Sequence, residues 1–169
     1  VPASSGERRL LVPSIKKADL MDVAGFIAAY EGLVAKARDG SLEVDDFRGT
    51  TVTLTNPGMI GTLHSVPRLM PGQGLIVGVG SMAYPAAFAG TSEETLARQG
   101  IGKIVTLTST YDHRVIQGAA SGEFLRLIER KLLGLDGFWE RTFESLRIPH
   151  EPVTWARDTT YDAELETGK

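Results

Sequence analysis

Apolar residues recur at intervals of three and four between residues 19 and 40, which is the spacing of one face of an α-helix. Asp19 is the expected N-cap of this helix, and Gly40 suits its C-terminal end. Tyr30 belongs to the apolar stripe, so we expect it in the core and not in a binding site. The stripe consists of Val23, Phe26, Ile27, Tyr30, Leu33, Val34 and Ala37.

A second stretch with the same periodicity begins after Gly118 and ends at Gly134. It predicts another amphipathic helix, and Asp136 then opens a further short helix with Phe143 facing inward. The apolar positions of the second helix are Phe124, Leu125, Ile128, Leu132 and Leu133.

Four stretches have the alternation or the apolar character of β-strands. Residues 50–54 are rich in β-formers and lead into the turn Asn56-Pro57-Gly58, and residues 75–79 follow Gly74. Residues 103–111 alternate up to a polar turn, while residues 10–15 form a shorter run that contains Pro13. Strands that alternate with helices predict an α/β fold, which we expect to be a two-layer sandwich with a mixed sheet.

Composition places the chain among ordinary globular proteins. It has 169 residues, of which 42% are hydrophobic and 23% charged, so one domain with a core is expected. The net charge of −3 gives no electrostatic reason to expect nucleic acid or an anionic membrane as a partner. No apolar run is long enough to span a membrane.

The absence of cysteine excludes disulfides, thiolate metal sites and a cysteine nucleophile, and we expect no metal site. The N-terminus has no signal-peptide character, so a cytoplasmic setting is expected. The chain begins with Val1 instead of methionine, which leads us to expect a piece of a longer protein.

One histidine follows an expected strand and has an acid and a base as its neighbours. Asp112-His113-Arg114 comes directly after the alternating stretch. A turn at a strand end exposes a side chain on a rigid support, where folds commonly present catalytic groups. Position alone leaves a structural role open as well, because a single histidine is more often a surface or hydrogen-bonded residue.

Residues 111–119 read Tyr-Asp-His-Arg-Val-Ile-Gln-Gly-Ala, which resembles the signature Asp-His-Arg-x-x-Asp-Gly. That signature belongs to the acyltransferase component of 2-oxo acid dehydrogenase complexes, a family that shares its fold with chloramphenicol acetyltransferase. Residues 10–158 resemble in particular the actinobacterial branch, in which this domain is fused to a thiamine-dependent 2-oxoglutarate decarboxylase. Three more phrases carry this resemblance: Leu54-Thr55-Asn56-Pro57-Gly58, Ser65-Val66-Pro67-Arg68-Leu69-Met70 and Gly137-Phe138-Trp139-Glu140.

The resemblance implies catalytic roles for His113 and Thr55. In the family the histidine is the general base that deprotonates the attacking thiol, and a neutral imidazole suits a thiol whose reference pKa is about 8.5. The family's hydroxyl residue at the end of an earlier strand hydrogen-bonds the oxyanion, and this role falls on Thr55. From the residues alone, Thr55 closing the turn is the preferred explanation.

The chain departs from the family signature at Gln117, where the family has Asp or sometimes Asn. An amide can hydrogen-bond but gives no negative charge to support an imidazolium. We expect Gln117, Asp112 and Arg114 to hold the geometry around His113.

Local composition predicts the two ends of the chain, and the resemblance implies the domain between them and an assembly. We expect a frayed N-terminus over 1–9, a catalytic domain over 10–153 that lacks the family's N-terminal portion, and a linker or tail over 154–169. The family works as a trimer whose active site lies between subunits. If this applies here, His113 of one copy faces Thr55 of the next.

The implied reaction moves a succinyl group between dihydrolipoyl-lysine and coenzyme A during 2-oxoglutarate dehydrogenation. Coenzyme A and the lipoyl group are then substrates, and a separate protein carries the lipoyl arm. Thiamine diphosphate and Mg would belong only to the fused decarboxylase part. The alternative is a catalytically weak scaffold that trimerises and docks the decarboxylase. A small-molecule acetyltransferase of the chloramphenicol type is a third possibility that the sequence phrases favour less.

Overall fold

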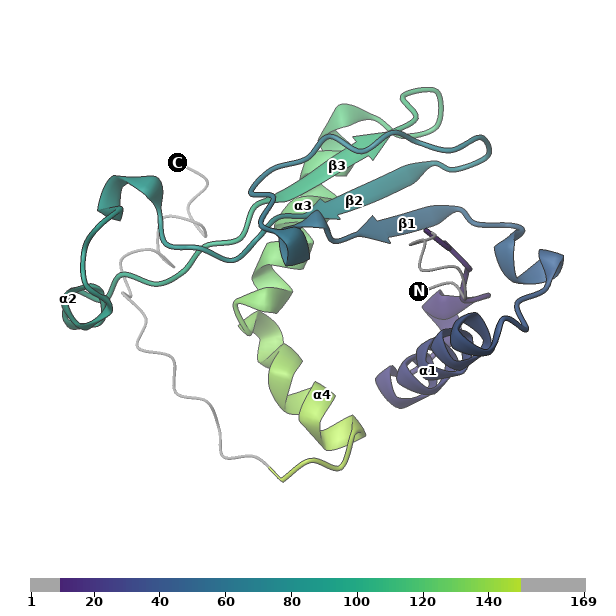
Figure 1. The fold of residues 1–169 in the computed structure, drawn as a ribbon, viewed down its shortest axis with the longest axis horizontal. Helices are drawn as coiled ribbons and strands as arrows, with labels where there is room; N and C mark the ends of the chain where they lie inside the picture. Colours follow the sequence, from purple (N-terminus) through teal and green to yellow (C-terminus); the bar gives the residue numbers. More distant parts are fainter. Residues whose placement is uncertain (1–9, 150–169) are drawn as a thin grey trace.

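The computed structural model describes residues 10–149, and the expected frayed end, domain boundary at 153 and tail lie outside that range. The fold contains a three-stranded mixed sheet with its strands in the order β1, β2, β3, and α1 and α4 lie below it in the view of Figure 1. β1 runs parallel to β2, and β2 runs antiparallel to β3. The strands span Val52–Thr55 (β1), Leu75–Val79 (β2) and Leu107–Tyr111 (β3).

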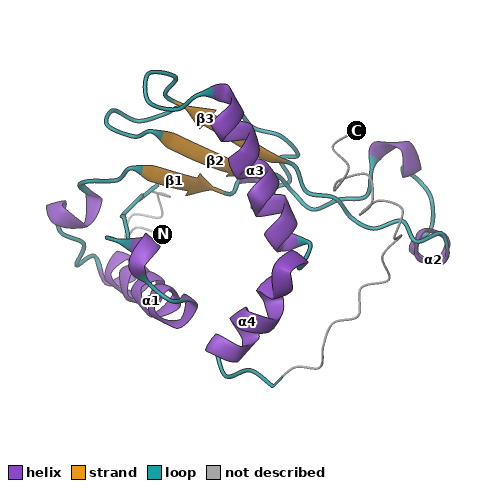
Figure 2. Cartoon of the chain, turned by 180° about the vertical axis from the view of Figure 1, so that it is seen from behind, coloured by secondary structure: helices purple, strands orange, loops and turns teal. Residues whose placement is uncertain are grey.

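The helices lie outside this sheet, and α3 crosses one of its faces in the view from behind (Figure 2). The Oγ atoms of Ser109 on β3 and Ser121 on α3 are 2.7 Å apart, which ties the two layers together. These layers confirm the predicted α/β class with a mixed sheet. The helices are α1 (Val23–Asp39), α2 (Glu93–Arg98), α3 (Gly118–Leu132) and α4 (Phe138–Ser145), and short 3-10 turns lie at Ala18–Leu20, Val44–Phe47, Pro57–Ile60, Ala86–Phe88 and Leu135–Gly137.

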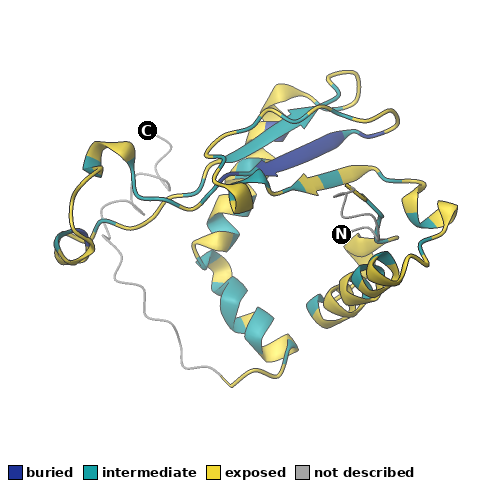
Figure 3. Ribbon diagram, viewed as in Figure 1, coloured by how far each residue is buried: buried dark blue, intermediate teal, exposed yellow. Residues whose placement is uncertain are grey.

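The central strand β2 forms most of the buried core (Figure 3). Its first three residues, Leu75, Ile76 and Val77, are at most 8% exposed, because strands flank it on both sides. A continuous apolar run of this length is typical of a strand that is covered on both faces. The predicted strand at 75–79 is confirmed with its bounds.

Three predictions about the N-terminal part need correction. Residues 10–15 form no strand. The N-cap of α1 is Asp22 and not Asp19, because the Asp22 carboxylate accepts a hydrogen bond from the Gly25 backbone N–H at 2.7 Å. Tyr30 is 57% exposed and is therefore not a core residue of the described structure, although Gly40 does end the helix.

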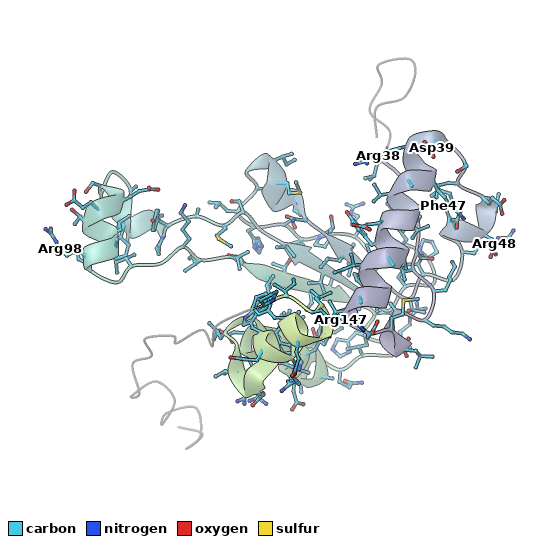
Figure 4. The ribbon with its side chains drawn as sticks, turned by 90° about the horizontal axis from the view of Figure 1, so that it is seen from below. Arg38, Asp39, Phe47, Arg48, Arg98 and Arg147 are labelled. Atoms are coloured by element: carbon cyan, nitrogen blue, oxygen red, sulfur yellow. The ribbon has the colours of Figure 1, made fainter. Side chains whose placement is uncertain are left out.

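The segment between β2 and β3 projects away from the sheet and carries α2 at its tip (Figure 1). Figure 4 shows Arg98 of α2 at the far end of this projection. Ser92 caps α2 by accepting a hydrogen bond from the Thr95 N–H, and Leu96 is 1% exposed. Lys103 to Val105 do not extend β3 as predicted, since only Ile104 pairs there, with Ala83.

Two glycines allow segments of the loop after β1 to pack closely against the backbone at the end of β2. A Cβ atom on Gly80 would lie 2.1 Å from the Leu63 carbonyl oxygen, and one on Gly58 would lie 2.3 Å from Gly80. No side chain fits at such distances, so glycine is required at both positions. The close approach holds the loop after β1 against the end of the sheet.

Candidate active site

His113 lies on a turn that begins where β3 ends. The Asp112 backbone N–H donates to the Gly74 carbonyl at 2.9 Å, which extends the β2–β3 pairing by one residue. The backbone N–H groups of Val115 and Ile116 donate back to the Asp112 carbonyl at 3.0 and 2.9 Å and close the turn. The His113 side chain is exposed, and its ring centroid lies 5.6 Å from that of Tyr111. A rigid turn therefore presents the imidazole to solvent.

Asp112 and Arg114 pair with each other across this turn. The Asp112 carboxylate accepts from the Arg114 backbone N–H at 3.0 Å, from Nε at 2.9 Å and from Nη2 at 2.6 Å. The hydrogen bonds from the Arg114 side chain and then from its backbone lower the Asp112 pKa to about 2. The same pairing raises the pKa of the Arg114 guanidinium. Two neighbours of His113 thus brace the turn as a bidentate ion pair.

Gln117 is the N-cap of α3, and its backbone carbonyl accepts from the Ser121 N–H at 3.1 Å. Its side chain is exposed and does not cap the helix. Within residues 10–149 no hydrogen bond joins the Gln117 amide to His113. The expected supporting role of Gln117 stays a prediction.

An open groove of about 610 Å³ adjoins His113. One wall is the turn after β3, and the other is the segment that leads into β2. Gln73 in that second wall is 5% exposed, and its Nε2 atom donates to Thr53 Oγ1 at 2.7 Å. This volume lies within the range of small-molecule binding sites, about 300–1,000 Å³. Its lining residues run over 69–74 and 111–115.

Thr55 is the last residue of β1 and is half-buried. It pairs with Gly78 near the C-terminal end of β2, whereas Asp112, just before His113, pairs with Gly74 at the N-terminal end. Gly74 and Gly78 are four residues apart along the extended chain, which corresponds to about 13 Å. Thr55 and His113 therefore lie at opposite ends of the same sheet. Within one chain, the two side chains are too far apart to contact the same reacting group.

Ser65 lies over Gly78, and the sequence pattern did not single it out. Its loop lies over Gly78, the residue that pairs with Thr55. One signal was available, because a glycine inside an apolar strand often marks a close approach of another segment. Nothing in the spacing indicated which segment approaches.

Two kinds of feature, clusters of metal-ligating side chains and membrane-spanning helices, are absent from the described residues. Residues 10–149 contain no cluster of three or more metal-ligating side chains. Over the same range, no helix combines the length and the apolar character that crossing a bilayer requires.

Comparison with known proteins gives one consistent result. Residues 3–136 match the family described as 2-oxoacid dehydrogenases acyltransferase (catalytic domain). A curated relative from Mycobacterium sp. (strain JLS), the multifunctional 2-oxoglutarate metabolism enzyme, is 61% identical over 153 residues. That match covers 90% of this chain but 12% of the relative, so the chain spans about an eighth of its length.

Two solved structures share the fold. One is a dihydrolipoamide acetyltransferase of Azotobacter vinelandii, at 28% identity and a TM-score of 0.56, covering 70% of this chain and 46% of that one. In that enzyme a serine, a histidine and an asparagine four positions further on have been investigated for their roles in catalysis. The other is the cubic core of the pyruvate dehydrogenase multienzyme complex, at 28% identity and a TM-score of 0.55, covering 69% of this chain and 45% of that one.

Proposed function

Because the chain belongs to the 2-oxoacid dehydrogenase acyltransferase family, we propose that it transfers a succinyl group between dihydrolipoyl-lysine and coenzyme A. The observation that carries the proposal is His113, held on a braced turn beside an open groove. The 2-oxoglutarate chemistry of the mycobacterial relative supports succinyl as the acyl group.

The proposed reaction needs one base and one hydrogen-bond donor. The neutral His113 imidazole takes the proton of the attacking thiol, and the resulting thiolate adds to the thioester carbonyl. The Thr55 hydroxyl donates a hydrogen bond to the oxyanion of the tetrahedral intermediate. The intermediate collapses, the C–S bond to the departing thiolate breaks, and the imidazolium returns the proton to that sulfur. The imidazole is regenerated in its neutral form, so the reaction can run in either direction between the dihydrolipoyl and coenzyme A thioesters.

The proposed site lies between two copies of the chain, with His113 from one and Thr55 from the other. Contacts that join two different surfaces of a subunit form a ring when the rotation between subunits closes, and we propose a homotrimer or a larger assembly built from it. Exposed apolar side chains at the Thr55 end of the sheet support such a contact, because large apolar patches mark interaction surfaces. They are Leu54, Met59, Ile60, Leu63 and Val66, each at least 59% exposed.

We assign coenzyme A and a lipoyl arm on a separate protein as the two thiol substrates. Thiamine diphosphate and Mg belong, in this proposal, to a fused decarboxylase part outside this chain. The multifunctional character of the mycobacterial relative supports that fusion.

The test is the His113→Ala variant of the full-length protein. Formation of succinyl-coenzyme A from a succinylated dihydrolipoyl substrate is expected to fall by about a hundredfold or more, because general-base catalysis contributes about 10²–10⁴-fold. Size-exclusion chromatography should show the same oligomer as the parent. Unchanged transfer by a correctly assembled variant would remove His113 from the chemistry.

A second candidate is a scaffold that holds the decarboxylase and transfers acyl groups weakly. The position of Gln117 favours it, since this side chain is exposed and contributes no charge to the imidazole. A scaffold predicts that 2-oxoglutarate decarboxylation depends on the domain while acyl transfer is slow and insensitive to His113→Ala.

A further inference from the structure

A serine hydroxyl over Gly78, the residue that pairs with Thr55, is buried and unused by the reaction proposed above. The Oγ atom of Ser65 has no hydrogen-bond partner among the described residues. A buried hydroxyl without a partner destabilises the fold, so native structures contain few of them. The position of this hydroxyl therefore calls for an explanation.

Register places Ser65 and Thr55 on the same face of the sheet. Gly78 of β2 pairs with Thr55 on one side and with Thr108 on the other. Residues that pair across neighbouring strands point to the same face. A Cβ atom on Gly78 would lie 2.6 Å from Thr108 Oγ1 and 2.9 Å from Ser65 Oγ. Three hydroxyl residues thus gather around one glycine.

The loop that carries Ser65 is anchored on both sides of that hydroxyl. Thr108 Oγ1 donates to the Ser65 carbonyl at 2.9 Å, so the Thr108 proton is already committed. The Ser81 N–H donates to the Thr62 carbonyl at 2.8 Å, and Gly80 allows the neighbouring backbone to approach closely. The Ser65 Oγ atom is held over the sheet with its proton still available.

We propose that Ser65 is a positioning residue for Thr55, an inference that rests on the function proposed above. The Ser65 hydroxyl donates to Thr55 Oγ1 while the Thr55 proton is directed at the oxyanion. A hydroxyl that accepts a hydrogen bond becomes a stronger donor, because linked hydrogen bonds polarise one another. Ser65 Oγ has no partner in the part of the chain that the structure describes, so the proposed hydrogen bond requires a change of side-chain rotamer, and no covalent bond changes at Ser65.

The test compares Ser65→Ala with the parent in the full-length protein, using succinyl-coenzyme A and dihydrolipoamide. We expect kcat to fall by about tenfold, the factor that one hydrogen bond of ordinary strength accounts for, with KM unchanged. The thermal midpoint should not fall, because the lost hydroxyl has no partner in the folded domain. Ser145→Ala, which removes a hydroxyl from α4, is the matched control and should leave kcat unchanged.

The same substitution is then made in a Thr55→Val background. If Ser65 acts through Thr55, Ser65→Ala has no further effect there. An unchanged kcat in the parent background, an equal loss in both backgrounds, or a lowered thermal midpoint would overturn the inference. If Thr55→Val alone leaves kcat unchanged, the role proposed for Thr55 fails first, and the inference fails with it.

Discussion

At the scale of single residues, the structure separates His113, the proposed base, from the residues that hold its turn. His113 is exposed on its turn, whereas Asp112 beside it is engaged by Arg114 through both backbone and side chain. The acid next to the histidine therefore does not act as a second base. Its contribution is to fix the turn that carries the imidazole.

Asp112→Asn tests this division of roles. A small displacement of a catalytic group can cost about a hundredfold, so we expect acyl transfer to fall by about ten- to a hundredfold. The shape of the pH profile between pH 5 and 8 should not change, because the Asp112 pKa of about 2 keeps the carboxylate ionised throughout that range. This depressed pKa also means that the ion pair stabilises the fold fully above about pH 4 and is lost as the pH falls through about 2.

Asp39→Asn at the end of α1, labelled in Figure 4, is the control for this measurement and should leave the rate unchanged. A displaced acid limb in the Asp112→Asn profile would show that Asp112 itself titrates in that range, against the assignment.

At the scale of elements, the sheet sets the distance between the two proposed catalytic residues. β1 and β2 are parallel and β3 returns antiparallel, so a residue at the end of β1 and a residue after β3 must lie at opposite ends. The antiparallel direction of β3 thus separates Thr55 from His113. The loop between β1 and β2 then adds Ser65 to the Thr55 end.

Gly80→Ala is expected to loosen this end of the sheet. The added methyl group would lie 2.1 Å from the Leu63 carbonyl oxygen and 3.2 Å from that of Thr106, both of which are backbone. Overpacking of this kind costs about 1–3 kcal/mol. Hydrogen exchange of β2 in the full-length protein should accelerate accordingly, whereas Gly102→Ala, which meets nothing within 4 Å, should leave it unchanged. Equal protection in both variants would contradict the close packing.

Periodicity and turn chemistry predicted most elements of this fold, and long-range contacts explain the exceptions. The apolar run of β2 and the stripe of α1 carry local signals, and both elements are present. The exposure of Tyr30 and the absence of a strand at 10–15 depend on what packs against them, which local sequence does not encode. For the site, the sequence motif indicated the candidate base His113. Ser65 could be identified only from the structure, because the relevant contact depends on the register of Gly78.

At the scale of the whole molecule, the described chain leaves large apolar side chains uncovered at the Thr55 end of the sheet. Met59 and Ile60 are each 85% exposed, and both lie in the turn that follows Thr55. A second copy that brings its His113 turn to this end would cover them and complete the proposed site. The predicted separation of roles between subunits follows from the same geometry.

Mixing two impaired variants measures this most directly. The His113→Ala and Thr55→Val proteins, each by itself far slower than the parent, are dissociated, combined in equal amounts and reassembled. Random mixing leaves both intact residues at about one interface in four, so acyl transfer should recover to about a quarter of the parent rate. No recovery in a reassembled mixed oligomer would contradict a site shared between copies of the chain.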